Sequence, residues 1–245
     1  MEEALSLEMD GSFVEAINCY HRAMDAGADP AEATLRIAGI FRKMNMSELA
    51  IALASSAAAM DPASIEAHEF IIVTAEAIGD RAATIAASQR AIKIAPDFVP
   101  AYNALGAALI QMGDISAALR ITAALVRLEP GEPAHHIKLA MLYQHQGEIG
   151  LAVREFSEAI RLNPDTALAD SAREALAGLD MFQFSHIVML ANEDRVFRLK
   201  LARAPESAVK ERGFCLSHYG IELLVDFCTH ALSALPEPLP TVLYH

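Results

Sequence analysis

The stretch Tyr102-Asn-Ala-Leu-Gly-Ala-Ala-Leu109 decides the fold that this sequence predicts. It is followed by Gly113, by a small residue at Ala118 and by Pro130. Glycine permits the left-handed conformation that ends a helix, and proline lacks the backbone N–H that a continuing helix needs. The stretch is therefore expected to begin a helical pair, with a tight turn at Gly113 and a second helix that ends before Pro130.

The same punctuation recurs along most of the chain. Four prolines are each 34 residues after the one before, at Pro62, Pro96, Pro130 and Pro164. The midpoint of each unit carries a glycine or, once, an asparagine, at Gly11, Asn45, Gly79, Gly113 and Gly147. Small residues recur where the paired helices would touch, at Ala16, Ala50, Ala118 and Ala152. The sequence predicts units at about 1–30, 31–64, 65–98, 99–132 and 133–166, and a closing helix at 167–178.

This pattern resembles the tetratricopeptide repeat, most clearly in residues 102–130 and in the unit that begins at Pro133. The second match rests on Leu139, Ala140, Tyr143, Gly147, Ala152, Phe156, Ala159 and Pro164. The resemblance covers residues 1–180 and implies a mainly α fold, an α-solenoid of helical hairpins. Small residues replace the aromatic side chain seen as Tyr20 and Phe156 in three units, at Ala54, Ser88 and Thr122. The unit at 65–98 is the least typical and is expected to pack more loosely.

In this family the first helices of the pairs line the concave side, so the resemblance implies a groove there for a protein or peptide partner. The side chains expected to face it are Leu35, Arg36, Glu69, Phe70, Val73, Asn103, Ala107, Ile110, Ile137, Lys138 and Met141. Apolar area left in water costs about 25 cal/mol per Å², which favours a peptide that brings apolar anchors.

Two alternatives for these side chains stay open. Phe70 and Met141 would also suit packing against a neighbouring hairpin, and Arg36 and Lys138 would suit ordinary solvated charges. Relatives that grip a C-terminal carboxylate carry polar residues at positions that here are Leu35, Gly39 and Ala104. A carboxylate clamp of that type is therefore not expected.

The 34-residue rhythm stops after about Asp180, so residues 181–245 are expected to form a small C-terminal module, with an α+β fold as one alternative. Phe197, Leu199 and Leu201 alternate with charged residues, which is the period of a half-buried strand. We therefore predict a β-hairpin over 186–201, with a helix as a nearly equal alternative. Short strands are predicted at 214–217 and 241–245, and a helix at 219–235.

Composition excludes several classes of function. The chain has 32 acidic and 19 basic residues and a net charge of −13, and this field repels phosphate backbones, so nucleic-acid binding is not expected. Apolar runs such as Ile51–Met60 are too short to cross a bilayer, and the N-terminus lacks the features of a secretory signal. The three cysteines are far apart in the sequence. No membrane association and a cytoplasmic location are expected.

The C-terminal module contains zinc-type ligands at Cys215, His218, Cys228 and His230. Cys228 and His230 are two residues apart on a predicted helix and so point in different directions. No metal, cofactor or catalytic residue is expected, and the predicted function is a protein- or peptide-binding scaffold. Three alternatives stay open: the interaction region of a bacterial transferase-like enzyme, a metal-binding C-terminal module, and self-association into homo-oligomers. His135, His136 and His145 are predicted to be hydrogen-bonded surface or groove residues.

Overall fold

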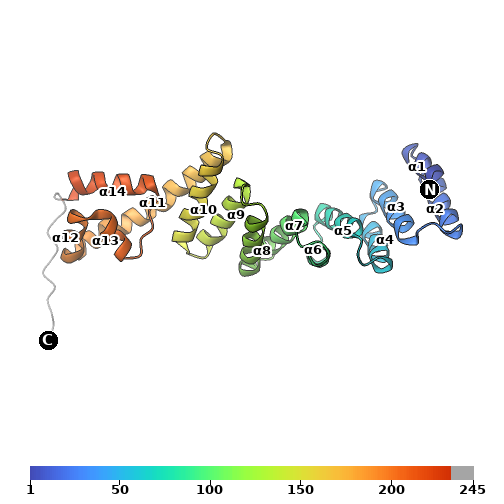
Figure 1. Ribbon diagram of the computed structural model, residues 1–245, viewed down its shortest axis with the longest axis horizontal. Helices are drawn as coiled ribbons and strands as arrows, with labels where there is room; N and C mark the ends of the chain where they lie inside the picture. The colour runs from blue at the N-terminus through green and yellow to red at the C-terminus, as the bar shows by residue number, and fades with distance from the viewer. Residues whose placement is uncertain (233–245) are drawn as a thin grey trace, which may run out of the picture. The chain divides into compact units, whose positions relative to one another are not determined.

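The computed structural model describes residues 1–232, and within that range the chain forms fourteen helices and no strand (Figure 1). It divides into two compact units, Met1–Leu128 and the part from Glu129 onward. The first unit contains α1 (Glu2–Met9), α2 (Phe13–Asp25), α3 (Pro30–Lys43), α4 (Ser47–Met60), α5 (Ile65–Ile78), α6 (Arg81–Ile94), α7 (Val99–Gln111) and α8 (Ile115–Leu128). The second contains α9 (Pro133–His145), α10 (Ile149–Leu162), α11 (Ala167–Glu193), α12 (Arg195–Arg203), α13 (Pro205–Glu211) and α14 (His218–His230). The mainly α fold is confirmed.

The second helix of each pair ends where the proline pattern predicts. Helices α4, α6, α8 and α10 end two residues before Pro62, Pro96, Pro130 and Pro164. The residue that precedes a proline is forced out of the helical region by the proline ring, so a helix stops just short of it. The 34-residue period of the sequence is therefore the period of the helical pairs.

The turn inside each pair is set by one residue with a positive φ. Gly79 ends α5 with a φ of 76°, and Asp80 then caps α6 by accepting a hydrogen bond from the backbone N–H of Ala83 at 3.0 Å. Asn45 takes the corresponding conformation between α3 and α4, with a φ of 60°. Asparagine tolerates this region better than most residues, which explains why it replaces glycine there.

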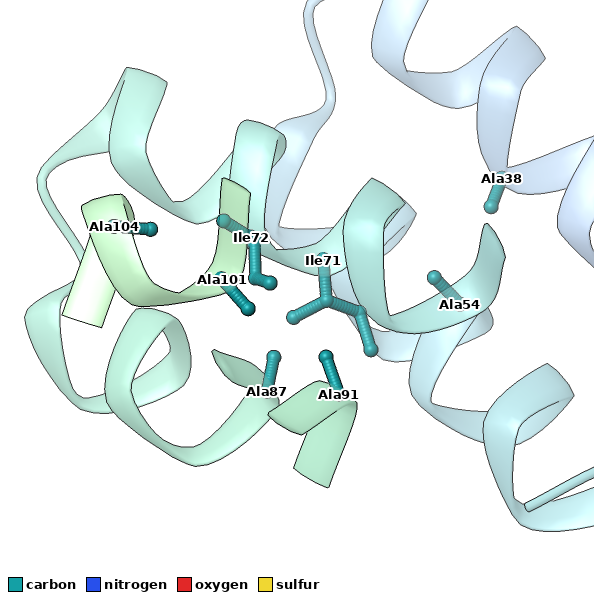
Figure 2. Close-up of a cluster of buried hydrophobic side chains, with 8 residues drawn as sticks. All are labelled: Ala38, Ala54, Ile71, Ile72, Ala87, Ala91, Ala101 and Ala104. Carbon is teal, nitrogen blue, oxygen red and sulfur yellow. The ribbon is translucent and has the colours of Figure 1, made fainter. Parts of the chain in front are cut away.

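Alanines let the helices of the first unit pack closely. One buried cluster combines Ile71 and Ile72 of α5 with alanines from α3, α4, α6 and α7, namely Ala38, Ala54, Ala87, Ala91, Ala101 and Ala104. Figure 2 shows the two isoleucine side chains pointing toward the alanines of α6 and α7. Helix axes approach closely only where the facing side chains are small.

One position of the second helix differs between repeats, as the sequence predicts. Tyr20 on α2 and Phe156 on α10 are fully buried aromatic side chains, whereas α4, α6 and α8 carry Ala54, Ser88 and Thr122 there. The Tyr20 hydroxyl donates to Glu8 at 3.1 Å, and burial, more than this hydrogen bond, raises the pKa of Tyr20 to about 12. The Ser88 hydroxyl is buried without a hydrogen-bond partner among the described residues.

The β-hairpin predicted over 186–201 is wrong, and the helical alternative is correct. The closing helix does not end near residue 178 but continues as α11 to Glu193, and α12 follows after one residue. Phe197 and Leu201, four residues apart, are buried, whereas Leu199 between them is 63% exposed. A strand would place Leu199 on the same face as this pair, whereas a helix keeps the pair together and turns Leu199 away from it. Although α11 has 27 residues, no described helix is long and apolar enough to span a membrane.

The segment before α14 is not the short strand that the sequence predicts. It is an irregular connection held by two side chains of α11. The Gln183 amide exchanges hydrogen bonds with the backbone of Cys215 at 2.8 and 2.9 Å, and the Asp180 carboxylate accepts one from the N–H of Ser217 at 2.8 Å. Helix α14 confirms the helix predicted at 219–235 in its main part. The strand predicted at 241–245 lies outside the described residues.

Candidate partner-binding groove

The first unit has a surface hollow between α1, α3 and α5, which we call the α3–α5 groove. Its volume is about 420 Å³. It is lined by Glu8 of α1, by Glu32, Leu35, Arg36, Gly39, Arg42 and Lys43 of α3, and by Glu66 and Phe70 of α5. The groove therefore lies on the first helices of consecutive pairs, where the repeat pattern predicts a binding surface. It brings together three of the predicted residues, Leu35, Arg36 and Phe70.

Leu35 and Phe70 form the apolar part of the α3–α5 groove. Both are half-buried and pack against the alanine cluster of the first unit, so one side of each side chain belongs to the core. The guanidinium of Arg42 lies 4.4 Å from the centre of the Phe70 ring, a cation–π contact that orders both side chains. Phe70 thus combines the two roles that its sequence position left open.

The charges around this apolar part are of both signs. Lys43 is paired with Glu8 at 2.7 Å, which ties α3 to α1. Arg36 lies 3.9 Å from Glu32, and both side chains are about half exposed, so water and salt screen this pair strongly. Arg36 can consequently exchange its contact with Glu32 for a ligand group at little cost.

The other predicted residues of the first unit lie outside the α3–α5 groove. Glu69 is exposed, and Val73 and Ile110 are 51% and 42% exposed. Ala107 lines a separate hollow of about 80 Å³. Asn103 is half-buried, with its amide 3.5 Å from the carbonyl oxygen of Val99. These side chains supply apolar surface on α5 and α7 without forming one enclosed site.

The three predicted residues of the second unit differ in their surroundings. Ile137 packs against the hydrophobic core around Ala140 and Phe156. Met141, four residues later on α9, is 59% exposed, and Lys138 is exposed between them. Met141 is therefore the exposed apolar side chain of this set on α9.

Two histidines of α9 are buried and hydrogen-bonded, rather than lying on the surface. His135 Nε2 lies 2.8 Å from the carboxylate of Glu129. His136 Nδ1 lies 2.8 Å from Glu155 of α10, and its Nε2 lies 3.1 Å from the carbonyl oxygen of Pro130. These contacts link α9 to the connection that precedes it and to α10.

The zinc-type residues near the C-terminus do not form one cluster. His218 pairs with Glu222 at 3.4 Å and His230 with Asp226 at 3.1 Å, both on the surface of α14. Cys215 is exposed, and burial raises the pKa of the Cys228 thiol to about 11. Among residues 1–232, no three acidic, histidine or cysteine side chains come together as metal ligands.

The sequence did not predict five of the groove residues, namely Glu8, Glu32, Arg42, Lys43 and Glu66. All except Glu8 lie three or four residues from a predicted groove residue or from Gly39, on the same helical face. Extending the predicted face of α3 and α5 by one helical turn in each direction would have found these four.

The chain resembles known tetratricopeptide-repeat structures. A tetratricopeptide-repeat family model matches residues 136–166. A crystal structure of MamA is 23% identical over 67% of this chain and 96% of that chain, with a TM-score of 0.55. The crystal structure of YrrB, described as a TPR protein with an unusual peptide-binding site, is 19% identical over 70% of this chain and 88% of that chain, with a TM-score of 0.55. No curated protein matches the chain in sequence.

The helical pairs and these likenesses define the fold, an α-solenoid of tetratricopeptide-type helical pairs. The family match at residues 136–166 supports the resemblance seen in the sequence.

Proposed function

We propose that the protein is a scaffold that binds a polypeptide partner in the α3–α5 groove. The observation that carries the proposal is the groove itself, in which Leu35 and Phe70 form an apolar part between charged side chains of both signs. A partner segment with one apolar anchor beside charged residues would cover this part and pair with Arg36. The exposed Val73 extends the apolar surface along α5.

The remaining predicted residues would contribute as secondary contacts. Ile110 and Ala107 on α7 and Met141 on α9 are exposed to a partner, whereas Asn103 and Ile137 would act through the helices that they support. The proposal includes no catalytic step. It places the protein in the cytoplasm, in keeping with its three free cysteines.

The experiment selects peptides from a random library on the whole protein and measures their affinity by fluorescence anisotropy. We expect Phe70→Ala to weaken the selected peptides at least about tenfold, because it removes the apolar contact at the centre of the groove. Arg36→Glu should weaken peptides that carry an acidic residue and spare the others.

Arg127→Glu is the matched control, since Arg127 is exposed on α8 and does not line the groove. Far-ultraviolet circular dichroism checks that every variant keeps its helicity. Peptides that bind the Phe70 and Arg36 variants as tightly as the unchanged protein would refute the groove as the binding site.

A further inference from the structure

Three successive repeats share a contact between the first helix and the proline before it. The side chain six residues after the proline binds the proline's carbonyl oxygen. His136 Nε2 lies 3.1 Å from Pro130 O, and the Tyr102 hydroxyl donates to Pro96 O at 3.0 Å. The ring of His68 makes the same contact with the backbone of Pro62. His68, Tyr102 and His136 are thus equivalent residues of the repeat, 34 positions apart.

The two histidines differ in what their other ring nitrogen meets. Nδ1 of His136 lies 2.8 Å from the carboxylate of Glu155, and both residues are buried. His68 is only 4% exposed. Its Nδ1 has no hydrogen-bond partner among the described residues. Glu155 follows His136 by 19 positions, and the residue 19 positions after His68 is Ala87. The repeat at 65–98 therefore has the histidine but not its carboxylate partner.

An open hollow is lined by both His68 and Ala87, the positions that correspond to His136 and Glu155. It lies between α4, α5 and α6, has a volume of about 330 Å³, and is lined by His68, Ala87 and Arg90 together with small and aliphatic residues. Figure 2 shows Ala87 and Ala91 of α6 beside Ile71 of α5. Ile71 and Ala87 also line the hollow. A buried polar atom without a partner is costly, so a ligand that satisfies Nδ1 gains free energy.

The charge in this hollow is positive. Arg90 is the one side chain in the described lining that carries a permanent charge, since α4 contributes only Ile51, Ser55, Ala58 and Ala59 and α5 adds Ile71. Arg90 forms no salt bridge with another described residue. Burial first, and then the charge of Arg90, lowers the pKa of His68. Neither His68 nor Arg90 is paired with a negatively charged group among the described residues.

We propose that this hollow is a binding site for a carboxylate on a short apolar stem, held by His68 Nδ1 and Arg90. Glu155 at His136 is the model for the first contact, and a charge-assisted hydrogen bond to arginine is the second. The stem packs against Ile51, Ile71 and Ala83. A free monocarboxylic acid or a glutamate side chain of a partner chain would present this chemistry, and a hollow of this volume holds either.

Binding of the carboxylate takes up one proton from solvent. The other His68 ring nitrogen already donates to a carbonyl oxygen, so Nδ1 must also carry a proton to donate to the ligand. The complex then contains an imidazolium and a carboxylate, and the ligand raises the pKa of His68. Affinity should therefore rise as the pH falls through the His68 pKa of the complex and level off below that of the free protein.

The test uses sodium hexanoate and a capped pentapeptide, acetyl-Ala-Leu-Glu-Leu-Ala-amide, added to the whole protein. The readout is the ring resonances of His68, followed by NMR across pH. We expect at least one of the two probes to shift these resonances and raise the His68 pKa. The corresponding glutamine peptide and hexan-1-ol should not. Binding of hexanoate alone indicates a small acid, and binding of the peptide alone indicates a protein side chain.

Two variants separate this site from a structural role of the histidine. Arg90→Gln, at an exposed position, should weaken the bound probe about tenfold without loss of helicity. Ala87→Glu installs the missing carboxylate, so it should raise the His68 pKa and abolish probe binding, whereas Ala87→Gln should block the space and leave the pKa low. His68 resonances that respond to neither probe, or that respond equally in Arg90→Gln, would overturn the proposal.

Discussion

The helix pairs α5–α6 and α9–α10 follow the same repeat pattern and differ in how their interior is filled. In α9–α10, Phe156 is fully buried and Glu155 satisfies His136. In α5–α6 the corresponding residues are Ser88 and Ala87, and a hollow lies beside His68. The flanking prolines and the turn glycines are common to both pairs. The comparison teaches that these few positions set the helical pair, whereas the filling of its interior can change from repeat to repeat.

The largest expected effect tests that difference directly. Phe156→Ala should lower the free energy of unfolding of the second unit by about 3–5 kcal/mol, because it removes a fully buried aromatic side chain. Ser88→Ala, at the equivalent position of α6, should change the stability of the first unit by less than about 1 kcal/mol, since its hydroxyl has no partner among the described residues. Urea denaturation followed by circular dichroism measures both. Similar losses of stability in the two variants would mean that the interiors of the two helix pairs are packed alike.

A smaller effect is expected where the repeats agree. Ala118 on α8 is fully buried between paired helices, so Ala118→Leu should overpack the contact and cost about 1–3 kcal/mol. Ala86→Leu on α6 is the control, because Ala86 is exposed at the rim of the hollow and a larger side chain has room there. Thermal unfolding compares the two variants, and an unchanged melting temperature in Ala118→Leu would contradict the assigned helix contact.

The smallest effect concerns the turns. Gly113→Ala should cost about 1 kcal/mol, because its φ of 78° is strained for a residue with a Cβ atom. Asn45→Gly, at the same place in an earlier repeat, should change stability by no more than about 0.5 kcal/mol, since asparagine already adopts the left-handed conformation. The two substitutions are compared by urea denaturation. A loss for Asn45→Gly as large as that for Gly113→Ala would show that the turns are not equivalent.

The sequence predicted the repeats well because their signals are local. A proline or a turn glycine acts on its own backbone, so Pro62 or Gly79 marks a helix end without knowledge of the partner helix. Between Asp180 and Ala204, where α11 ends and α12 lies, the chain has no proline or glycine. There the alternation of Phe197, Leu199 and Leu201 indicated a strand, although α11, α13 and α14 bury only the two outer residues. The secondary structure of that segment is determined by tertiary packing, which a short sequence pattern does not contain.

The candidate groove was predictable in part for a similar reason. Leu35, Arg36 and Phe70 followed from the helical period and the repeat, and they line the α3–α5 groove. The contact of Arg42 with Phe70 and that of Lys43 with Glu8 depend on how α1, α3 and α5 are placed. That placement is not encoded at any single position. The binding role of these residues stays a prediction until the peptide experiment is done.

The contact between the carbonyl of Pro62, Pro96 or Pro130 and the side chain six residues later has a consequence for how such a chain can change in length. Adding or deleting one residue between Pro130 and His136 would rotate the His136 ring away from its acceptor and leave a buried ring nitrogen without a hydrogen-bond partner. The connections between repeats are thus fixed in length. Natural variants of this array are expected to gain or lose whole segments of 34 residues, while single-residue insertions collect elsewhere.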